Sequence, residues 1–343
     1  MIDLTLVTTA VKQETHDTKT FYLEPDNKSA IEYKAGQFLT LIFHHRGNEI
    51  RRSYSLGSTP GIDNELFITV KRKINGEISR QLFDHYKPGD IIASLMPAGR
   101  FIIEEPFASV YFFITAGSGI TPIFSLVKEL LYKHPETKVI LINQCRNERD
   151  VIYKHQLKEL ELKFAARFYV IQFFSRPHSR KHKAQRLNNE LLEKIIHQTP
   201  ELQFQTANFY LCGPIAFMRM AQFTLKTIGF NDEQIHKEQF VIDLPPPVPF
   251  LSDTAPKSAV IYFQQKKYSL TVAYPQTILD AALQNNIELP YSCKAGRCST
   301  CAALCIKGKV KMSINEVLTE RDIEKGLVLT CVGYAETDME LSF

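Results

Sequence analysis

The first hundred residues alternate short apolar runs with turn-forming residues, and one short helical stretch interrupts them. Apolar strands at this spacing, separated by Pro-Gly and Gly-containing turns, are typical of a closed antiparallel barrel. The expected strands are 4–11, 20–23, 38–43, 66–71 and 91–95, and the expected helix is 79–85. We therefore predict an antiparallel β-barrel domain over residues 1–105, the first part of a multidomain chain.

The pattern changes from about residue 107, where strongly apolar runs alternate with amphipathic segments. Buried strands that alternate with helices predict a parallel, doubly wound sheet. The expected strands are 110–116, 138–143, 167–174 and 208–211, and the expected helices are 122–132, 153–162, 188–197 and 215–228. We predict an α/β parallel-sheet domain over residues 106–242.

A proline-rich segment separates this domain from the C-terminal one. Five prolines fall within residues 243–257. Because proline cannot join a helix interior or a central strand, we expect a semi-stiff, extended linker. Beyond it, the apolar pattern predicts a hairpin of strands 259–264 and 268–272, followed by a helix over 277–285. An α+β domain of the β-grasp type is therefore expected over residues 258–343.

Composition and charge restrict the classes of function. A hydrophobic content of 44% and a net charge of +4 are ordinary for a globular chain and give no indication of nucleic-acid binding. The apolar runs have the length of strands, well short of the ~20 residues of a membrane span, and the N-terminus lacks the features of a secretory signal. We therefore expect a cytoplasmic protein without a nucleic-acid partner or an integral membrane segment.

Four of the seven cysteines lie near the C-terminus at a diagnostic spacing. Cys293, Cys298 and Cys301 form a Cys-x4-Cys-x2-Cys motif, and Cys331 follows after 29 intervening residues. This is the plant-type spacing for a [2Fe–2S] cluster. Structural zinc usually uses two short paired clips, and disulfides are disfavoured by the odd cysteine count. The four thiols are therefore the predicted ligands of a [2Fe–2S] cluster.

Two short motifs in the predicted barrel supply parts that a flavin requires. Arg52-Ser-Tyr-Ser55, on an extended segment, offers a cation, an aromatic ring and a hydroxyl, with Tyr54 and Ser55 on opposite faces. Taken alone, this motif is also explained by a surface strand with a buried tyrosine. Gly76-Glu-Ile-Ser79 follows and opens the short helix, where a glycine turn forms a phosphate cradle. Together the two motifs predict a flavin site.

Two segments at the carboxyl ends of α/β strands suit a nicotinamide dinucleotide. Thr115-Ala-Gly-Ser-Gly-Ile-Thr-Pro122 joins a strand to a helix, and its glycines would let a pyrophosphate approach the backbone. A plain tight turn would explain the same residues. Cys212-Gly-Pro214 ends the last predicted strand, at the edge where open α/β sheets bind ligands. The alternative for Cys212 is a buried structural thiol.

A basic run follows another strand of the same sheet. It begins with Ser175 and Arg176 and carries further cations up to Arg186. NAD-specific sites place an acid at such a position, so arginine there favours NADPH through its 2′-phosphate. A solvated loop is the simpler alternative. Arg146 and Arg149 could assist, or could pair with the neighbouring residues Glu148 and Asp150.

Taken in order, these motifs resemble the ferredoxin–NADP reductase superfamily. With its C-terminal cluster domain, the chain resembles one branch, the reductase subunit of phenylacetyl-CoA epoxidase and related oxygenase and desaturase reductases. The resemblance covers essentially the whole chain. It implies electron flow from NADPH to FAD, then to the [2Fe–2S] cluster and on to an electron-accepting partner protein. The expected partner is a diiron oxygenase such as phenylacetyl-CoA epoxidase, which would place the chain in phenylacetate degradation.

The resemblance also implies roles for matching residues. Ser55, Cys212 and Glu238 would be catalytic, with Ser55 and Glu238 near the flavin and Cys212 near the nicotinamide C4. Arg52 would bind the FAD pyrophosphate, and Tyr54 would lie against the isoalloxazine ring. The remaining cofactor contacts would come from Gly76, Ile78 and Ser79 for the flavin phosphates, from Gly117, Ser118, Gly119, Thr121, Gly213 and Pro214 for the dinucleotide, and from Ser175, Arg176 and Arg186 for its 2′-phosphate. Asn75 stands where relatives often have a second glycine, which leaves FMN open.

Other functions stay open on the sequence alone. The same reductase could serve a fatty-acid desaturase, a hybrid-cluster protein or a separate ferredoxin. A redox-sensing iron–sulfur binding protein is a candidate from another class, although the flavin and nicotinamide motifs argue against it. The surface around Lys294 and Arg297, beside the cluster loop, is the expected partner face.

Overall fold

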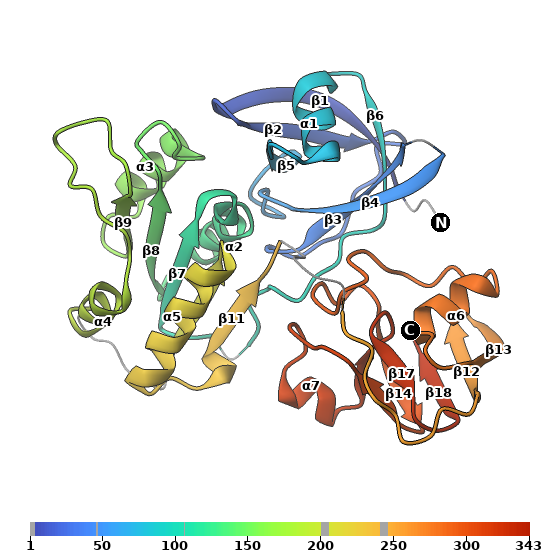
Figure 1. Ribbon diagram of the computed structural model, residues 1–343. Coiled ribbons are helices and arrows are strands. Elements are labelled where there is room, and N and C mark those ends of the chain that lie inside the picture. The colour runs from blue at the N-terminus through green and yellow to red at the C-terminus, as the bar shows by residue number, and fades with distance from the viewer. Residues whose placement is uncertain (1–3, 46, 106, 200–205, 241–245) are drawn as a thin grey trace. The chain divides into compact units, whose positions relative to one another are not determined.

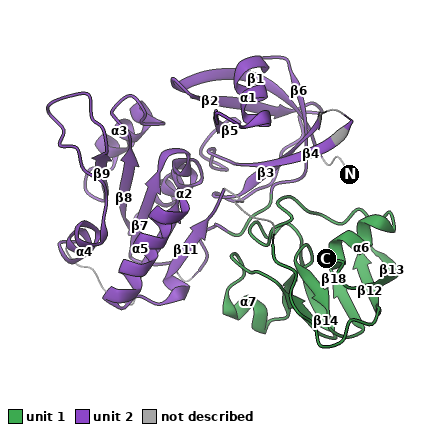
Figure 2. Cartoon of the chain, in the orientation of Figure 1, with its two compact units in different colours: residues 1, 98–100, 241–343 green, residues 2–97, 101–240 purple. Residues whose placement is uncertain are grey.

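The computed structural model describes residues 4–45, 47–105, 107–199, 206–240 and 246–343 (Figure 1). The chain divides into two compact units (Figure 2). The larger unit comprises residues 2–97 and 101–240, and the smaller one comprises residues 1, 98–100 and 241–343. Among the described residues, none of the helices combines the length and the apolar character that crossing a bilayer requires.

The N-terminal part of the larger unit is the predicted antiparallel barrel. Its six strands lie in the order β4-β3-β6-β1-β2-β5. A bridge between Leu56 and Ile68 connects the end of one edge strand to the other, which closes the sheet around an apolar core. The elements are β1 Leu4–Thr15, β2 Thr18–Pro25, β3 Phe38–His45, β4 Asn48–Ser55, β5 Leu66–Lys71, α1 Glu77–His85 and β6 Ile91–Ser94.

The second part of the larger unit is a five-stranded parallel sheet in the order β11-β10-β7-β8-β9. Alternate residues of β7 face opposite sides: Tyr111 and Phe113 pack with α2 and α3, whereas Phe112 and Ile114 pack with α4 and α5. The sheet is therefore covered on both faces, as predicted. The elements are β7 Val110–Ala116, α2 Ile120–Lys133, β8 Lys138–Cys145, α3 Lys154–Lys163, β9 Phe168–Phe174, α4 Asn189–His197, β10 Ala207–Cys212, α5 Ile215–Ile228 and β11 Ile235–Glu238.

Buried polar contacts join the barrel to the parallel-sheet domain within this unit. The Lys128 ammonium on α2 forms an ion pair with Asp63 of the barrel and is itself only 5% exposed. The Tyr153 ring stacks on Phe124 at 4.3 Å, and its hydroxyl lies 2.5 Å from the Thr69 hydroxyl on β5. Because buried polar groups are costly when unpaired, these contacts fix how the two domains meet.

The smaller unit is the predicted β-grasp domain. Its main sheet has the order β13-β12-β18-β14-β16, with β12 and β13 as the predicted hairpin and β18 parallel to β12. Helix α6 contributes to the apolar core, which also contains Cys301 and Cys331. The elements are β12 Lys257–Phe263, β13 Lys266–Val272, α6 Ile278–Gln284, β14 Ala302–Lys307, β15 Val310–Met312, α7 Glu320–Glu324, β16 Leu327–Leu329, β17 Gly333–Ala335 and β18 Met339–Ser342.

The predicted linker is only partly described, because residues 243–245 lie outside the described residues, as does the predicted boundary at 242/243. Its described part, before β12, carries no helix or strand. The Pro249 carbonyl accepts a hydrogen bond from the Tyr274 hydroxyl at 3.2 Å, and Leu251 is 5% exposed. This end of the linker is therefore packed on the β-grasp domain.

Candidate functional site

The carboxyl ends of three parallel strands carry the centre of the candidate site. Thr115 on β7, Cys212 on β10 and Glu238 on β11 lie side by side in the sheet register. Ser55, the last residue of barrel strand β4, donates a hydrogen bond to Glu238 Oε2 at 2.9 Å. The structure therefore brings together the three residues that the resemblance implies as catalytic.

Burial controls the protonation of this centre. Burial raises the pKa of Glu238 to about 8, and the hydrogen bond from Ser55 opposes that rise. Cys212 is 0% exposed, and burial together with the Glu238 charge raises the pKa of its thiol well above the usual value. At neutral pH both groups are therefore mainly neutral. Glu238 can hold a proton at this edge of the sheet and release it to a neighbour.

The glycine-rich turn packs directly on the Cys212-Gly213 backbone. The turn after β7 is a 3₁₀ segment, Gly117–Gly119, which leads into α2. Gly117 has φ +62°, and a Cβ on Gly119 would lie 2.1 Å from the Cys212 carbonyl oxygen. Only glycine fits such a contact, so backbone N–H groups and the N-terminus of α2 stay open to an anion.

Neighbouring residues complete this edge. The Thr121 hydroxyl donates to the Ser118 carbonyl at 3.0 Å, which fixes the first turn of α2. Pro214 is exposed and stands immediately before α5, so a second helix N-terminus lies at the carboxyl end of β10. Two helix N-termini at one edge suit the pyrophosphate of a dinucleotide. The residues present therefore fit a pyridine nucleotide.

The flavin motifs lie on the barrel. Arg52 is exposed on β4, whereas Tyr54 packs partly against the barrel core and burial raises the pKa of its hydroxyl. Gly76 stands immediately before α1, where a Cβ would lie 2.3 Å from the Ser79 hydroxyl oxygen. Ile78 is 2% exposed and belongs to the core, so only its backbone could reach a phosphate. The absence of a side chain at Gly76 therefore leaves the backbone of this turn accessible to a flavin phosphate.

The basic run after β9 is held against the turn that follows β8. The N–H of Arg176 donates to the Arg146 carbonyl at 2.7 Å. The Glu148 carboxylate accepts hydrogen bonds from the backbone N–H groups of His178 and Ser179, each at 3.0 Å. The pKa of Glu148 is lowered to about 2 by hydrogen bonds from backbone N–H groups. The largest effect comes from its own N–H, followed by those of His178 and Ser179. The run is therefore an anchored loop.

Glu148 and Asp150, the alternative partners considered for Arg146 and Arg149, each have another hydrogen-bond partner. Glu148 binds backbone N–H groups, and Asp150 accepts a hydrogen bond from Asn147 at 2.8 Å. Ser175 is half-buried at the start of the loop, where its N–H donates to the Cys145 carbonyl at 3.1 Å. Arg176 and Arg186 are both exposed. The two arginine side chains therefore remain accessible to a phosphate.

The four predicted cluster ligands gather in the β-grasp domain. The Cys293 thiol forms hydrogen bonds with the thiols of Cys298 and Cys331, and these lower its pKa, while Cys301 likewise contacts Cys331. Backbone N–H groups also point at sulfur, as in the 3.3 Å contact from Ala295 to Cys293 Sγ. Such thiol and N–H groups are the ligands and hydrogen-bond donors of iron–sulfur clusters.

The sulfurs contact one another in a row, in the order Cys298, Cys293, Cys331 and Cys301. No compact group of three or more His, Cys, Asp or Glu side chains suited to one metal ion occurs in the described part of the chain. A [2Fe–2S] cluster has two irons, each of which takes two protein ligands. Contacts among three thiols of the loop and one from a distant segment are therefore compatible with this cluster. The four cysteine thiols therefore fit a [2Fe–2S] cluster.

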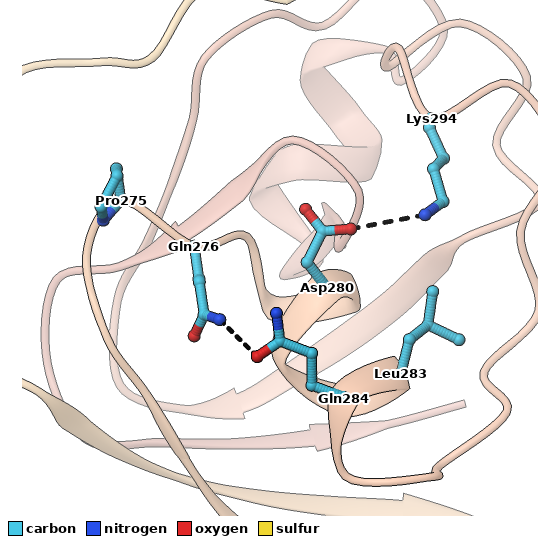
Figure 3. Close-up of a pocket in the computed structure, with 6 residues that line it drawn as sticks. All are labelled: Pro275, Gln276, Asp280, Leu283, Gln284 and Lys294. Carbon is cyan, nitrogen blue, oxygen red and sulfur yellow. Dashed lines mark hydrogen bonds and ion pairs between the residues drawn. The ribbon is translucent and has the colours of Figure 1, made fainter.

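The expected partner face requires a correction. Arg297 is only 11% exposed in its side chain and forms an ion pair with Glu316 at 3.1 Å. Lys294 remains 44% exposed and lies 3.4 Å from Asp280, beside a shallow cavity of about 480 Å³ (Figure 3). Of the two cations, Lys294 is therefore the more exposed one.

Three family models match consecutive parts of the chain. An oxidoreductase FAD-binding domain matches residues 5–103, and an oxidoreductase NAD-binding domain matches residues 113–222. A 2Fe-2S iron-sulfur cluster binding domain matches residues 261–336. FAD, a pyridine nucleotide and a [2Fe–2S] cluster are therefore the cofactors of this chain.

A curated relative decides the family. The ferredoxin reductase component of 3-ketosteroid-9-alpha-monooxygenase from Mycobacterium tuberculosis is 33% identical over 317 residues, which cover 90% of this chain and 84% of the relative. The chain belongs to the ferredoxin–NADP reductase superfamily, with a C-terminal [2Fe–2S] domain. This reductase is also 31% identical to a component of 1,2-phenylacetyl-CoA epoxidase from Escherichia coli, over 95% of this chain and 93% of the relative.

A solved structure shows the same fold. Phthalate dioxygenase reductase aligns with a TM-score of 0.62 and 20% identity, over 99% of this chain and 98% of that chain. The three predicted fold classes are therefore confirmed. The chain is an electron-transfer oxidoreductase that uses a flavin and a pyridine nucleotide.

Proposed function

We propose that this reductase is the electron-supplying component of an oxygenase system and works in the cytoplasm. It takes a hydride from NADPH and delivers single electrons through FAD and the [2Fe–2S] cluster to a partner metalloenzyme. The first candidate partner is a diiron oxygenase of the phenylacetyl-CoA epoxidase type, which would place the chain in phenylacetate degradation. The observation that carries this proposal is the presence of all three domains on one chain that is 31–33% identical to components of a monooxygenase and an epoxidase.

The barrel residues would hold the flavin. Arg52 would bind the pyrophosphate, and the Gly76 turn with Ser79 and the Ile78 N–H would bind phosphate oxygens. Tyr54 would lie against the ring system. When bound, the flavin exchanges a hydride for single electrons, a conversion that neither the nucleotide nor the cluster makes alone. Ser55 and Glu238, linked at 2.9 Å, would hold a proton beside the reactive edge of the ring.

The edge of the parallel sheet would hold the nucleotide. The turn of Gly117, Ser118 and Gly119 with Thr121 would bind the pyrophosphate, and Gly213 and Pro214 would border the nicotinamide. Cys212 is placed at the same edge. Because its side chain is fully buried, contact with the nicotinamide requires the residues that cover it to move.

The basic loop would select NADPH. Ser175, Arg176 and Arg186 would bind the 2′-phosphate, and the anchoring of the loop by Glu148 supports this assignment because it orders the backbone that carries them. A hydrogen bond to a charged group contributes about 1.5–3 kcal/mol. The loss of one such contact should therefore lower kcat/KM for NADPH by roughly 10- to 100-fold, at tenfold per 1.36 kcal/mol.

The test of nucleotide choice compares Arg176→Ala with Arg180→Ala, a control on the same loop whose side chain is also exposed. We expect Arg176→Ala to lower kcat/KM for NADPH while the value for NADH stays unchanged, and Arg180→Ala to have a small effect on both. Equal use of NADH and NADPH by the unaltered protein would mean that the loop has no role in selection.

A second acceptor class is favoured by the 33% identity to the ketosteroid monooxygenase reductase. Because this identity is close to the 31% shared with the epoxidase component, sequence similarity alone does not choose the partner. The deciding experiment combines the purified reductase with each oxygenase and NADPH, and measures hydroxylated steroid against epoxidised thioester. Product from the epoxidase alone supports the first candidate, and product from the steroid oxygenase alone overturns it.

A further inference from the structure

One segment of the β-grasp domain connects the two parts of the chain that carry the cluster ligands. We call residues 313–318 the strap. At one end, the Ser313 N–H donates to the Val332 carbonyl at 3.0 Å, next to Cys331. In its middle, the Glu316 N–H donates to the Gly296 carbonyl at 3.1 Å, inside the Cys293–Cys301 loop. The strap is therefore bonded both to the loop and to the distant ligand.

The strap has a defined shape of its own. The Asn315 side-chain oxygen accepts hydrogen bonds from the N–H groups of Val317 at 3.2 Å and Leu318 at 2.8 Å. The amide nitrogen of Asn315 donates to the Leu318 carbonyl at 2.8 Å, and Leu318 is 7% exposed in the domain core. A side chain that binds its own backbone in this way fixes a turn.

Arg297 and Glu316 join the strap to the loop through their side chains. Arg297 Nε lies 3.1 Å from Glu316 Oε2, and Arg297 Nη2 donates to Oε1 at 3.3 Å. One hydrogen bond from Nη2 and the close approach of Nε therefore hold the guanidinium against the carboxylate. The backbone N–H of Arg297 also donates to the Cys293 thiol, and Cys298 is the next residue. One residue therefore contacts both a ligand and the strap.

The loop also rests on the strap at a glycine. Gly296 has φ +69°, a left-handed conformation that suits glycine, and a Cβ there would lie 2.9 Å from the Ile314 carbonyl oxygen. The two backbones are thus in close contact. A strap that moved away would leave this side of the loop without support.

We propose that the Arg297–Glu316 ion pair fastens the strap to the cluster loop and thereby positions the N–H groups around Cys293 and Cys298. The role is one of positioning, because neither side chain is a predicted ligand. Donors to the ligand sulfurs tune an iron–sulfur cluster and hold its ligands in place. The proposal is independent of which acceptor this reductase serves.

A second ion pair provides a matched control. Lys294 also stands next to Cys293, and its ammonium lies 3.4 Å from Asp280 on α6 (Figure 3). Both of these side chains are exposed, by 44% and 46%, and Asp280 does not belong to the strap. Neutralising Lys294 or Asp280 changes the charge near the ligand Cys293 by the same amount as neutralising Arg297 or Glu316. It leaves the ion pair between the strap and the cluster loop intact.

The experiment compares Arg297→Gln, Glu316→Gln and the double variant with the controls Lys294→Gln and Asp280→Asn in the full-length, cofactor-loaded protein. The rate of cluster loss to excess EDTA is followed by visible circular dichroism without oxygen, and the midpoint potential is measured by spectroelectrochemistry. We expect each strap variant to lose its cluster roughly 10-fold faster or more, at the lower end of the effect of removing partners of metal ligands. The double variant should be no faster than the faster single one, because the two residues act as one unit.

The controls should change the rate by no more than a few-fold, as is usual for exposed ion pairs. Equal acceleration in strap and control variants would overturn the proposal, because charge alone would then explain it. Unchanged rates and potentials in the strap variants would overturn it as well. Arg297→Lys keeps the charge but removes the guanidinium that donates to Glu316, so it is the milder variant if Arg297→Gln retains no cluster. It should lie between the unaltered protein and Glu316→Gln.

Discussion

The carboxyl group of Glu238 gives the sharpest prediction about pH. Glu238 lies at the end of β11, half-buried, and accepts a hydrogen bond from Ser55 at 2.9 Å. Burial raises its pKa from 4.5 to about 8. Glu238→Gln keeps the size and an oxygen acceptor for Ser55 but removes the titration. The variant therefore isolates the free-energy cost of ionising this carboxyl in the folded protein.

The sign of the effect follows from linkage. An unfolded chain ionises this carboxyl near pH 4.5, whereas the folded protein keeps the proton up to about pH 8. The folded state therefore loses stability as the pH rises between these values, and the loss is complete above them. At 1.36 kcal/mol per pH unit, the difference between 4.5 and about 8 sets an upper limit of about 5 kcal/mol. Partial exposure of the side chain reduces this to a few kcal/mol.

The assay is the thermal midpoint of flavin release, followed by flavin fluorescence, for the unaltered protein and Glu238→Gln. The midpoints should nearly coincide at pH 5. At pH 8.5 the midpoint of the unaltered protein should lie roughly 5–15 °C below that of Glu238→Gln. This range follows from a shift of about 2–4 °C per kcal/mol for a unit of this size. Glu233→Gln is the control, because Glu233 is exposed on the turn just before β11. If the difference in thermal midpoint between Glu238→Gln and the unaltered protein is the same at both pH values, the reasoning is refuted.

Two further changes test the nucleotide site. Gly119→Ala would place a Cβ 2.1 Å from the Cys212 carbonyl oxygen, so the turn must shift; we expect loss of NADPH binding in fluorescence titrations with flavin content retained. Normal affinity for NADPH would place the dinucleotide elsewhere. Glu148→Ala removes the acceptor of the loop N–H groups, so KM for NADPH should rise roughly 10-fold while KM for NADH changes little. Parallel rises for both nucleotides in steady-state assays would show a general effect on folding.

The sequence pattern predicted the layers of the fold well where apolar runs are long. β7 Val110–Ala116 and α5 Ile215–Ile228 have the predicted bounds, because glycine or proline stands at their ends. β11 Ile235–Glu238 was not predicted. It has four residues, half of them charged, and becomes a strand through parallel pairing with β10. Strands β15 to β18, after the cysteine loop, have three or four residues each, and only their sheet partners define them.

The candidate site was predictable where a cofactor requires particular residues at a fixed spacing along the sequence. The four cysteines and the glycine turn follow from local sequence, since a cluster and a tight turn each demand particular residues. The Ser55–Glu238 hydrogen bond joins residues 183 positions apart and depends on how the barrel meets the sheet. The anchoring role of Glu148 was missed because its carboxylate binds backbone N–H groups, which leave no signal in the sequence. The role of Glu316 was missed because its partners, the Gly296 carbonyl and the Arg297 side chain, belong to another segment of the chain. The predicted domain bounds and the roles of individual site residues stay predictions.

The most direct test of electron flow is an anaerobic titration of the fully loaded protein with NADPH, followed by visible absorbance. We expect near-stoichiometric NADPH to bleach the flavin and cluster bands together, as electron flow from the flavin through the cluster requires. Bleaching of the flavin while the cluster stays oxidised would contradict this expectation, because the cluster would then lie off the path of electron flow.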